Sequence, residues 1–371
     1  MAGVTVIKPD LQAIKQIMAS GGESVKKCFQ CATCSVVCNI SPDSKPFPRK
    51  EMIMAQWGLK EELVKNPDIW LCHQCSDCTA YCPRGAKPGE VLGALRQMCI
   101  QHYATPPILA KMVQDPKYLP LLIAFPILLL LVALKFIGRL AIPAGTIVYG
   151  KMFPTLLVDF IFTGAAAFAV AVLAKGVMAY WKDINVNPWT VKVKGNLFGN
   201  LIAVLKDILW HNRFRQCEIT YTRATNHLLV VFGFLFLALV TALAFYHEWF
   251  DPHDKITKVY VAMKLLAIPG TAALLYGIYG IIKERRANAE QAGAGSYFDW
   301  FLIYVITAVG FTGLGSWLFR LVGIKILAYP TYFLHLTAVF MLFFYAPFSK
   351  MAHMVYRTVA MLHARMSDRG F

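Results

Sequence analysis

Six apolar runs, each about 20 residues long, constrain this chain more than any other feature of its sequence. A helix of about 20 apolar residues spans the hydrocarbon core of a bilayer, where only helices and closed barrels satisfy every backbone hydrogen bond. The runs cover residues 118–137, 154–178, 226–246, 259–282, 300–319 and 329–348. The sequence therefore predicts a six-span helical bundle. Pro120 and Pro126 would kink the first run, so five spans are the alternative.

The basic residues predict the orientation of this bundle. The chain of 371 residues has a net charge of +16, but its Lys and Arg residues lie mostly between the apolar runs, which argues against a nucleic-acid partner. With the N-terminus inside, inner segments carry fourteen basic residues and outer segments seven. The first 22 residues contain no apolar signal core. We therefore expect a multi-pass protein of the cytoplasmic membrane with both termini in the cytoplasm. Residues 189–210 either lie along the inner membrane surface or form an ordinary loop with a short helix.

Two cysteine motifs lie in the polar segment that precedes the bundle. Eight of the ten cysteines fall in two runs with the spacing C-x2-C-x2-C-x3-C. In such runs the first three thiolates surround one iron–sulfur cluster and the fourth reaches the other cluster. The spacing predicts two [4Fe–4S] clusters with crossed ligand sets: Cys28, Cys31, Cys34 and Cys82 for cluster 1, and Cys72, Cys75, Cys78 and Cys38 for cluster 2.

Zinc is the alternative metal for these cysteines, but structural zinc normally takes two separated cysteine pairs. One residue departs from the usual pattern, because Asn39 rather than proline follows Cys38. The remaining Cys99 and Cys217 are interpreted as packed thiols. A helical pattern fills the gap between the two motifs. We expect an all-α protein, with an α-helical ferredoxin domain over residues 1–117 and a membrane haem domain of cytochrome b type over residues 118–371.

Four histidines lie in or near the ends of two predicted spans. His335 and His353 are 18 residues apart, which is five turns of a continuous helix and places both side chains on one face. Antiparallel spans bring His227 level with His353 and His247 level with His335. The pattern predicts an inner haem b held by His227 and His353, and an outer haem b held by His247 and His335. The outer pair fits less well, because His227 and His247 face nearly opposite ways on a straight helix. His211, His253 and His363 are interpreted as surface residues.

Three stretches resemble known redox proteins. Residues 334–337 and 346–353 are similar to the haem-binding helix of respiratory nitrate reductase gamma subunits, although Leu237 replaces that family's second histidine. Residues 68–75 resemble the small iron–sulfur subunit of heterodisulfide reductases. The combination resembles the C subunits of the quinone-interacting membrane-bound oxidoreductases (Qmo) of sulfate reducers. That resemblance implies menaquinone as the membrane substrate, cytoplasmic flavin and iron–sulfur subunits as partners, and adenylylsulfate reductase downstream.

These observations favour a quinone oxidoreductase subunit that acts as part of a complex. Quinol would be oxidised near the outer haem, and Lys258 and Lys264 are the candidate partners of the quinone carbonyls. Their alternative interpretation is a pair of interfacial lysines. The alternative function is a haem-containing membrane anchor that docks a soluble reductase without quinone turnover. A transporter is disfavoured because the sequence lacks inverted repeats and paired broken helices.

Overall fold

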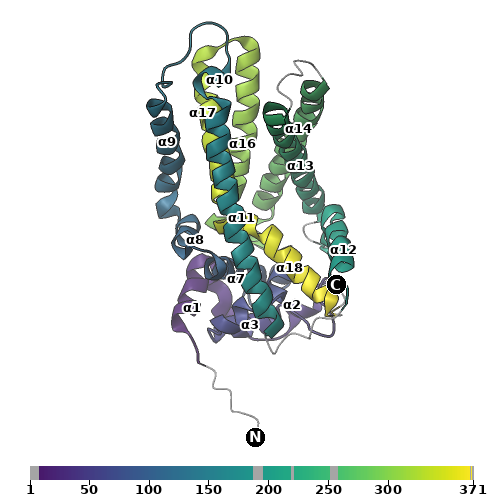
Figure 1. Cartoon of the computed structure of the whole chain (residues 1–371). Coiled ribbons are helices and arrows are strands. Elements are labelled where there is room, and N and C mark those ends of the chain that lie inside the picture. The colour runs from purple at the N-terminus through teal and green to yellow at the C-terminus, as the bar shows by residue number, and fades with distance from the viewer. Residues whose placement is uncertain (1–7, 187–194, 219–220, 251–257, 368, 370–371) are drawn as a thin grey trace.

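The protein is described by a computed structural model that covers residues 8–186, 195–218, 221–250, 258–367 and 369. Throughout these residues the regular structure is helical, with no strand, so the predicted all-α class is confirmed. Figure 1 shows a compact group of short helices at one end of a bundle of long helices. We call the part before Leu119 the head and the long helices the bundle.

The head consists of short helices arranged around one longer helix. That central helix is α7 (Pro88–Tyr103), which begins with a proline at its first position and buries Val91, Leu95 and Cys99. The other helices are α1 (Leu11–Ile17), α2 (Thr33–Val36), α3 (Arg49–Gln56), α4 (Lys60–Val64), α5 (Asp68–Leu71), α6 (Asp77–Ala80) and α8 (Pro107–Gln114), with irregular turns η1 (Met18–Gly22) and η2 (Glu23–Lys27). The cysteine motifs occupy loops between these helices, with Cys34 in α2 and Cys78 in α6, so the compact core holds both motifs in place.

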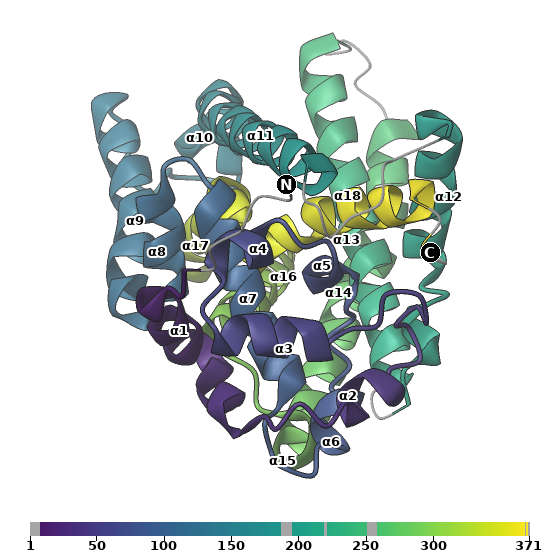
Figure 2. The same ribbon diagram turned by 90° about the horizontal axis from the view of Figure 1, so that it is seen from below.

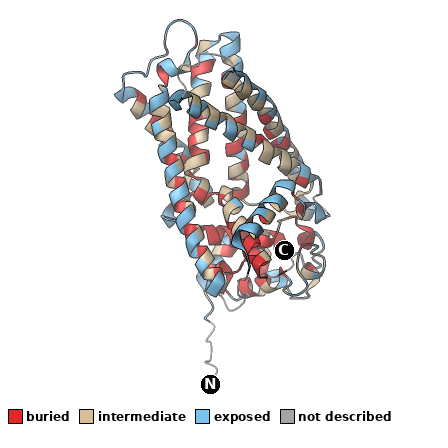
Figure 3. Ribbon diagram, turned by 45° about the vertical axis from the view of Figure 1, so that its right-hand side comes forward, coloured by how far each residue is buried: buried red, intermediate tan, exposed pale blue. Residues whose placement is uncertain are grey.

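Within the described residues, six helices are long and apolar enough to cross a membrane, as the sequence predicts. They are α9 (Leu119–Phe136), α11 (Thr155–Val186), α13 (Tyr221–Phe250), α14 (Lys258–Ala287), α16 (Tyr297–Val322) and α17 (Lys325–Phe344). Figure 3 shows buried residues gathered in the head, whereas the long helices expose much of their surface. Apolar side chains such as Phe136, Phe160 and Val170 are exposed on these helices. Apolar surface of this extent is what lipid would cover. The chain is therefore a multi-pass membrane protein.

Glycines let α13 and α14 pack closely as an antiparallel hairpin. A Cβ atom added at Gly233 would lie 2.6 Å from the backbone nitrogen of Leu274, and one added at Gly277 would lie 2.7 Å from the carbonyl oxygen of Asn226. Small residues at such crossings allow the two backbones to approach, which is the usual way that helices associate in lipid. Because Asn226 precedes His227, this contact also fixes the height of that histidine.

The sixth span begins and ends four residues earlier than predicted, and the helix does not continue to His353. α17 ends at Phe344, followed by the single turns η5 (Ala346–Phe348) and η6 (Lys350–Ala352), and His353 begins a separate helix, α18 (His353–Met366). Pro347 has no amide hydrogen to donate, and the Ser349 side chain accepts from the amide of Met351 to start the next turn. The predicted single face shared by His335 and His353 is therefore wrong, because the two residues lie on different helices.

The C-terminal helix α18 lies between the head and the bundle. It packs against α5 of the head and against α12 (Leu197–Trp210). Figure 2, viewed from the head side, shows α18 crossing from α17 toward α12. α12 covers part of the segment predicted to lie along the membrane, and residues 187–194 fall outside the described part of the chain. The remaining elements are η3 (Pro116–Tyr118), α10 (Tyr149–Met152), η4 (Phe214–Gln216) and α15 (Ala289–Ala292).

Candidate redox site

Two loops of the same conformation carry the first three cysteines of each motif. In the first loop Gln30 and Ala32 have φ angles of 60° and 69°, and in the second Gln74 and Ser76 have φ angles of 53° and 72°. Non-glycine residues seldom adopt these left-handed angles. Their recurrence at matching positions means that both loops turn in the same way around a centre. The two motifs therefore form one repeated structure.

Each loop surrounds a small cavity together with one cysteine of the other motif. The first cavity is lined by Cys28, Cys31, Cys34 and Cys82. The second cavity is lined by Cys72, Cys75, Cys78 and Cys38. The structure thus brings together the same two groups of four thiols that the sequence spacing pairs.

The thiols of each group lie close to one another; Cys34, Cys72, Cys75 and Cys78 are buried, Cys28, Cys38 and Cys82 are half-buried, and Cys31 is exposed. Burial, and then the neighbouring thiols of Cys28, Cys82 and Cys31, raise the pKa of Cys34 to about 11. Burial and the neighbouring Cys72 raise the pKa of Cys38 to about 12. Four thiolates gathered at one place repel one another unless a cationic centre lies among them. The donor set and the shape of each cavity therefore fit an iron–sulfur cluster.

Three basic side chains connect the second cysteine loop to the bundle. Arg223 of α13 donates to the carbonyl oxygen of Gln74 at 2.8 Å, and Arg357 of α18 donates to that of Cys72 at 2.8 Å. Lys350 donates to the side-chain oxygen of Gln74 at 3.1 Å. These cations lie beside a group of thiols that becomes anionic when it binds metal, so they stabilise it electrostatically. The second cysteine group is therefore held directly against the membrane part.

Asn39, the residue that replaces the usual proline, has a structural role. Its side-chain amide donates to the carbonyl oxygen of Gln216 at 3.0 Å, in the segment between α12 and α13. A proline side chain cannot make this hydrogen bond. The departure from the usual motif is thus linked to the docking of the head on the bundle.

His227 and His353 lie close to this junction. Their imidazoles are near enough for their charges to interact. The Nδ1 atom of His227 is 2.7 Å from Nε2 of His211, and the Nδ1 atom of His353 contacts the carbonyl oxygen of Lys350. In both rings the Nδ1 atom is engaged and the Nε2 atom remains for another partner. That pattern, in which a second contact orients a ligating imidazole, is typical of metal-binding histidines.

An aromatic contact links the cysteine loop to the same histidines. The ring of His73, which follows Cys72, stacks on Phe214 with centroids 5.3 Å apart. The ring of Phe214 lies 6.0 Å from that of His227. The second cysteine group and the predicted inner haem ligands therefore belong to one contiguous region.

The outer histidines are arranged differently. Nδ1 of His335 lies 3.2 Å from the hydroxyl of Thr312 and 3.2 Å from the carbonyl oxygen of Val309, both on α16. Gly313 provides room for this ring, since a Cβ atom there would lie 3.0 Å from its Cε1 atom. His247 is half-buried near the end of α13. The described contacts of His335 are thus with α16, while His247 lies on the other helical hairpin.

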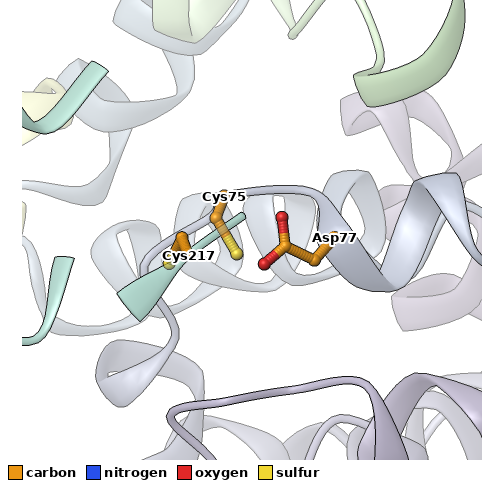
Figure 4. A group of neighbouring side chains, drawn as sticks. All are labelled: Cys75, Asp77 and Cys217. Atoms are coloured by element: carbon orange, nitrogen blue, oxygen red, sulfur yellow. The ribbon is translucent and has the colours of Figure 1, made fainter. Parts of the chain in front are cut away.

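Two residues that the sequence analysis assigned to the surface are buried. His211 is 7% exposed and contacts His227, and His363 of α18 is 0% exposed. Neither burial could be inferred from spacing, because both result from packing between distant segments. Cys217, interpreted as a packed thiol, is buried but lies beside Cys75 (Figure 4). His253 lies outside the described residues.

The two lysines proposed for the quinone both belong to α14. Lys264 is exposed on α14. The side chain of Lys258, the first residue of α14, lies outside the described part of the chain.

Comparison with known proteins agrees with this division of the chain. Residues 24–86 match the family of 4Fe–4S dicluster domains, and residues 115–370 match the family of citrate utilization protein B. The domain match and the cysteine-rich loops together assign [4Fe–4S] clusters to the head. No solved structure matches the chain.

Individual relatives cover either the head or most of the chain. The head is 36% identical over 88 residues to the C subunit of the H(2):CoB-CoM heterodisulfide,ferredoxin reductase of Methanothermobacter marburgensis, a match that covers 24% of this chain and 47% of that protein. It is 35% identical over 85 residues to an Archaeoglobus profundus protein that is itself like the C subunit of heterodisulfide reductase, covering 23% of this chain and 45% of that protein. The match therefore spans about half the length of these relatives. Citrate utilization protein B of Escherichia coli is 23% identical over 320 residues, which is 81% of this chain and 82% of that protein.

Proposed function

The chain belongs to the citrate utilization protein B family, with an iron–sulfur head related to the C subunit of heterodisulfide reductase, and we propose that it passes electrons between the membrane quinone pool and cytoplasmic subunits. The matches support an iron–sulfur electron-transfer membrane subunit of a redox complex. We propose in addition that the chain binds haem b and reacts with quinone. The observation that carries it is the contiguity of the second cysteine group with His227 and His353.

We assign the two clusters to the crossed ligand sets. Cys28, Cys31, Cys34 and Cys82 would hold cluster 1, and Cys72, Cys75, Cys78 and Cys38 would hold cluster 2. When bound, such clusters supply one-electron carriers. The chain's own contribution is to place cluster 2 at the bundle through Arg223, Lys350 and Arg357, and to leave cluster 1 farther from it.

We assign the inner haem to His227 and His353, whose Nδ1 atoms are already engaged. His211 orients the first ring and the Lys350 carbonyl orients the second, so each Nε2 is available to iron. We assign the outer haem to His247 and His335 on the basis of their positions along the spans. The Nδ1 atom of His335 contacts the carbonyl oxygen of Val309 on α16, much as that of His353 contacts Lys350. The assignment of His335 as a haem ligand is therefore better supported than that of His247.

The orientation of the chain in the membrane and the location of the quinone site belong to the same proposal. The bias of basic residues supports a cytoplasmic position for the head and for both termini. Lys258 and Lys264 are the proposed partners of the quinone. Undiminished quinol-dependent reduction in variants with either lysine replaced by alanine would remove that assignment. By its resemblance to Qmo C subunits, the chain would use menaquinone and supply flavin and iron–sulfur subunits in sulfate respiration, with adenylylsulfate reductase as acceptor.

The proposal is tested by counting haem in the full-length protein purified in detergent. We expect His227→Ala and His353→Ala to lose one haem per chain in a pyridine haemochrome assay, because each removes one axial ligand. The control is His102→Ala, which replaces an exposed histidine of the head. We also expect a menaquinol analogue to reduce the haem of the wild-type protein.

Two other outcomes would change the conclusion. A wild-type protein without a haem spectrum, or unchanged haem in both variants, would contradict the assignment of His227 and His353. One haem per chain with no response to quinol would favour the membrane anchor without quinone turnover, in which Leu237 marks the missing outer ligand.

A further inference from the structure

Cys217 lies next to a proposed ligand of cluster 2 although it belongs to neither cysteine motif. It follows η4 and precedes α13, and it is only 2% exposed. Its Sγ atom, the Sγ atom of Cys75 and a carboxylate oxygen of Asp77 all lie within 4.8 Å of one another. Figure 4 shows Cys217 approaching Cys75 from a segment separate from the cysteine loop, with Asp77 on the other side of the Cys75 sulfur.

The segment that carries Cys217 is tied to the surroundings of cluster 2 on both sides. Before it, the carbonyl oxygen of Gln216 accepts from Asn39 at 3.0 Å. After it, the backbone amide of Glu218 donates to Asp77 at 3.1 Å, and the carboxylate of Glu218 accepts from Tyr81 at 3.4 Å. These contacts join residues that are 137 or more positions apart in the sequence. The position of Cys217 beside Cys75 is therefore a feature of the fold and is independent of the cysteine motifs.

The chemistry of the two thiols differs once iron is bound. The Sγ atoms of Cys217 and Cys75 lie within 4.8 Å of each other, so the two side chains are neighbours. A cysteine bound to a cluster is a thiolate and can only accept, so the hydrogen of this contact must belong to Cys217. Hydrogen bonds to cluster sulfur atoms withdraw negative charge and stabilise the reduced state. The carboxylate of Asp77 acts in the opposite sense, because its negative charge disfavours an added electron.

We propose that Cys217 is a positioning residue for cluster 2, whose thiol donates a hydrogen bond to the Sγ atom of Cys75 and raises the reduction potential of that cluster. This inference rests on the proposed function, since it takes Cys75 as an iron ligand. Cys217 precedes α13, and His227 lies in that helix ten residues later. The bundle thus supplies a group that tunes the cluster docked on it.

The test is a redox titration of the full-length protein, monitored by electron paramagnetic resonance. We expect Cys217→Ala to shift the midpoint potential of one cluster to a lower value and to leave the other cluster unchanged. Cys217→Ser keeps a donor at the same place, so its shift should be smaller. Cys99→Ala is the matched control, because Cys99 is a buried head cysteine in α7 that belongs to neither motif, and both potentials should stay at the wild-type values.

Several results would overturn the inference. The first is an unchanged potential in Cys217→Ala while both clusters are present. The second is loss of a cluster in Cys217→Ala together with its retention in Cys75→Ala, which would make Cys217 the ligand. Iron and sulfide analysis of the wild-type protein distinguishes failure of the proposed function from failure of the role of Cys217. Absence of a second cluster would contradict the proposed function itself, whereas two clusters with unaltered potentials would contradict only the role of Cys217.

Discussion

Individual residues at the redox site owe their roles to partners far away in the sequence. Asn39 binds Gln216, and His211 binds His227. His363 is fully buried against Trp181, and burial followed by the charges of Arg369 and Lys45 lowers the pKa of His363 to about 4. The sequence predicts the cysteines and the two histidines of the proposed inner pair. The side chains that orient them could not be predicted, because that orientation depends on packing.

The crossed arrangement of the cysteines makes a prediction at the scale of single residues. We expect Cys38→Ser to damage the same cluster as Cys75→Ser, because these side chains line one cavity. Cys82→Ser should damage the other cluster, as Cys31→Ser does. Electron paramagnetic resonance spectra of the four variants, with iron counted per chain, measure this. If Cys38→Ser groups with Cys31→Ser, the ligand sets follow the sequence motifs and are not crossed.

At the scale of elements, breaks and close approaches decide where the ligands lie. The helical pattern predicted between the two cysteine motifs includes α3 and α4, which are separated at Gly58. There φ is +67°, and an added Cβ atom would lie 2.4 Å from the carbonyl oxygen of Asp10. The break between α17 and α18 has a comparable effect in the bundle. It turns the chain so that His353 lies beside the head, near His227.

The α13–α14 hairpin provides a prediction at this scale. Gly277→Ala places a methyl group 2.7 Å from the carbonyl oxygen of Asn226, so the helices must separate and move His227. Overpacking of this kind costs about 1–3 kcal/mol. We expect a lower thermal midpoint in detergent and reduced haem content. Gly164→Ala in α11 is the control, because a Cβ atom there meets nothing within 4 Å. Normal haem content in Gly277→Ala would show that the close contact does not position His227.

At the scale of the whole molecule, the head is joined to the bundle through buried charges. Both carboxylate oxygens of Asp68 in α5 are used: one accepts from Lys50 at 2.7 Å and the other from Arg369 at 2.6 Å. Asp68 is fully buried and Arg369 is 3% exposed. Trp70 in the same helix stacks on Tyr356 of α18 with ring centroids 5.2 Å apart. The C-terminal helix is thus bound to the head on the side of cluster 2.

Removing the charge of Asp68 tests this connection. Asp68→Asn leaves the cations of Lys50 and Arg369 without their common partner, and breaking a buried ion pair in this way costs about 3–5 kcal/mol. We expect a lower thermal midpoint and faster proteolysis of the C-terminal helix. The exposed Asp43→Asn serves as control. Equal stability of the two variants would mean that the Asp68 network contributes little to docking.

The helical class, the six spans and the two groups of ligand-type cysteines can be read from the amino-acid sequence alone. These features depend on local composition and on spacing within single segments, which are independent of how the segments pack together. Tertiary packing set the rest: the end of α17 before His353, the contact of His211 with His227, and the approach of Cys217 to Cys75. Each of these joins segments that are distant in the sequence, or breaks a helix where packing makes the break favourable. No periodicity within one segment contains that information, because it arises only when the head and the bundle pack together.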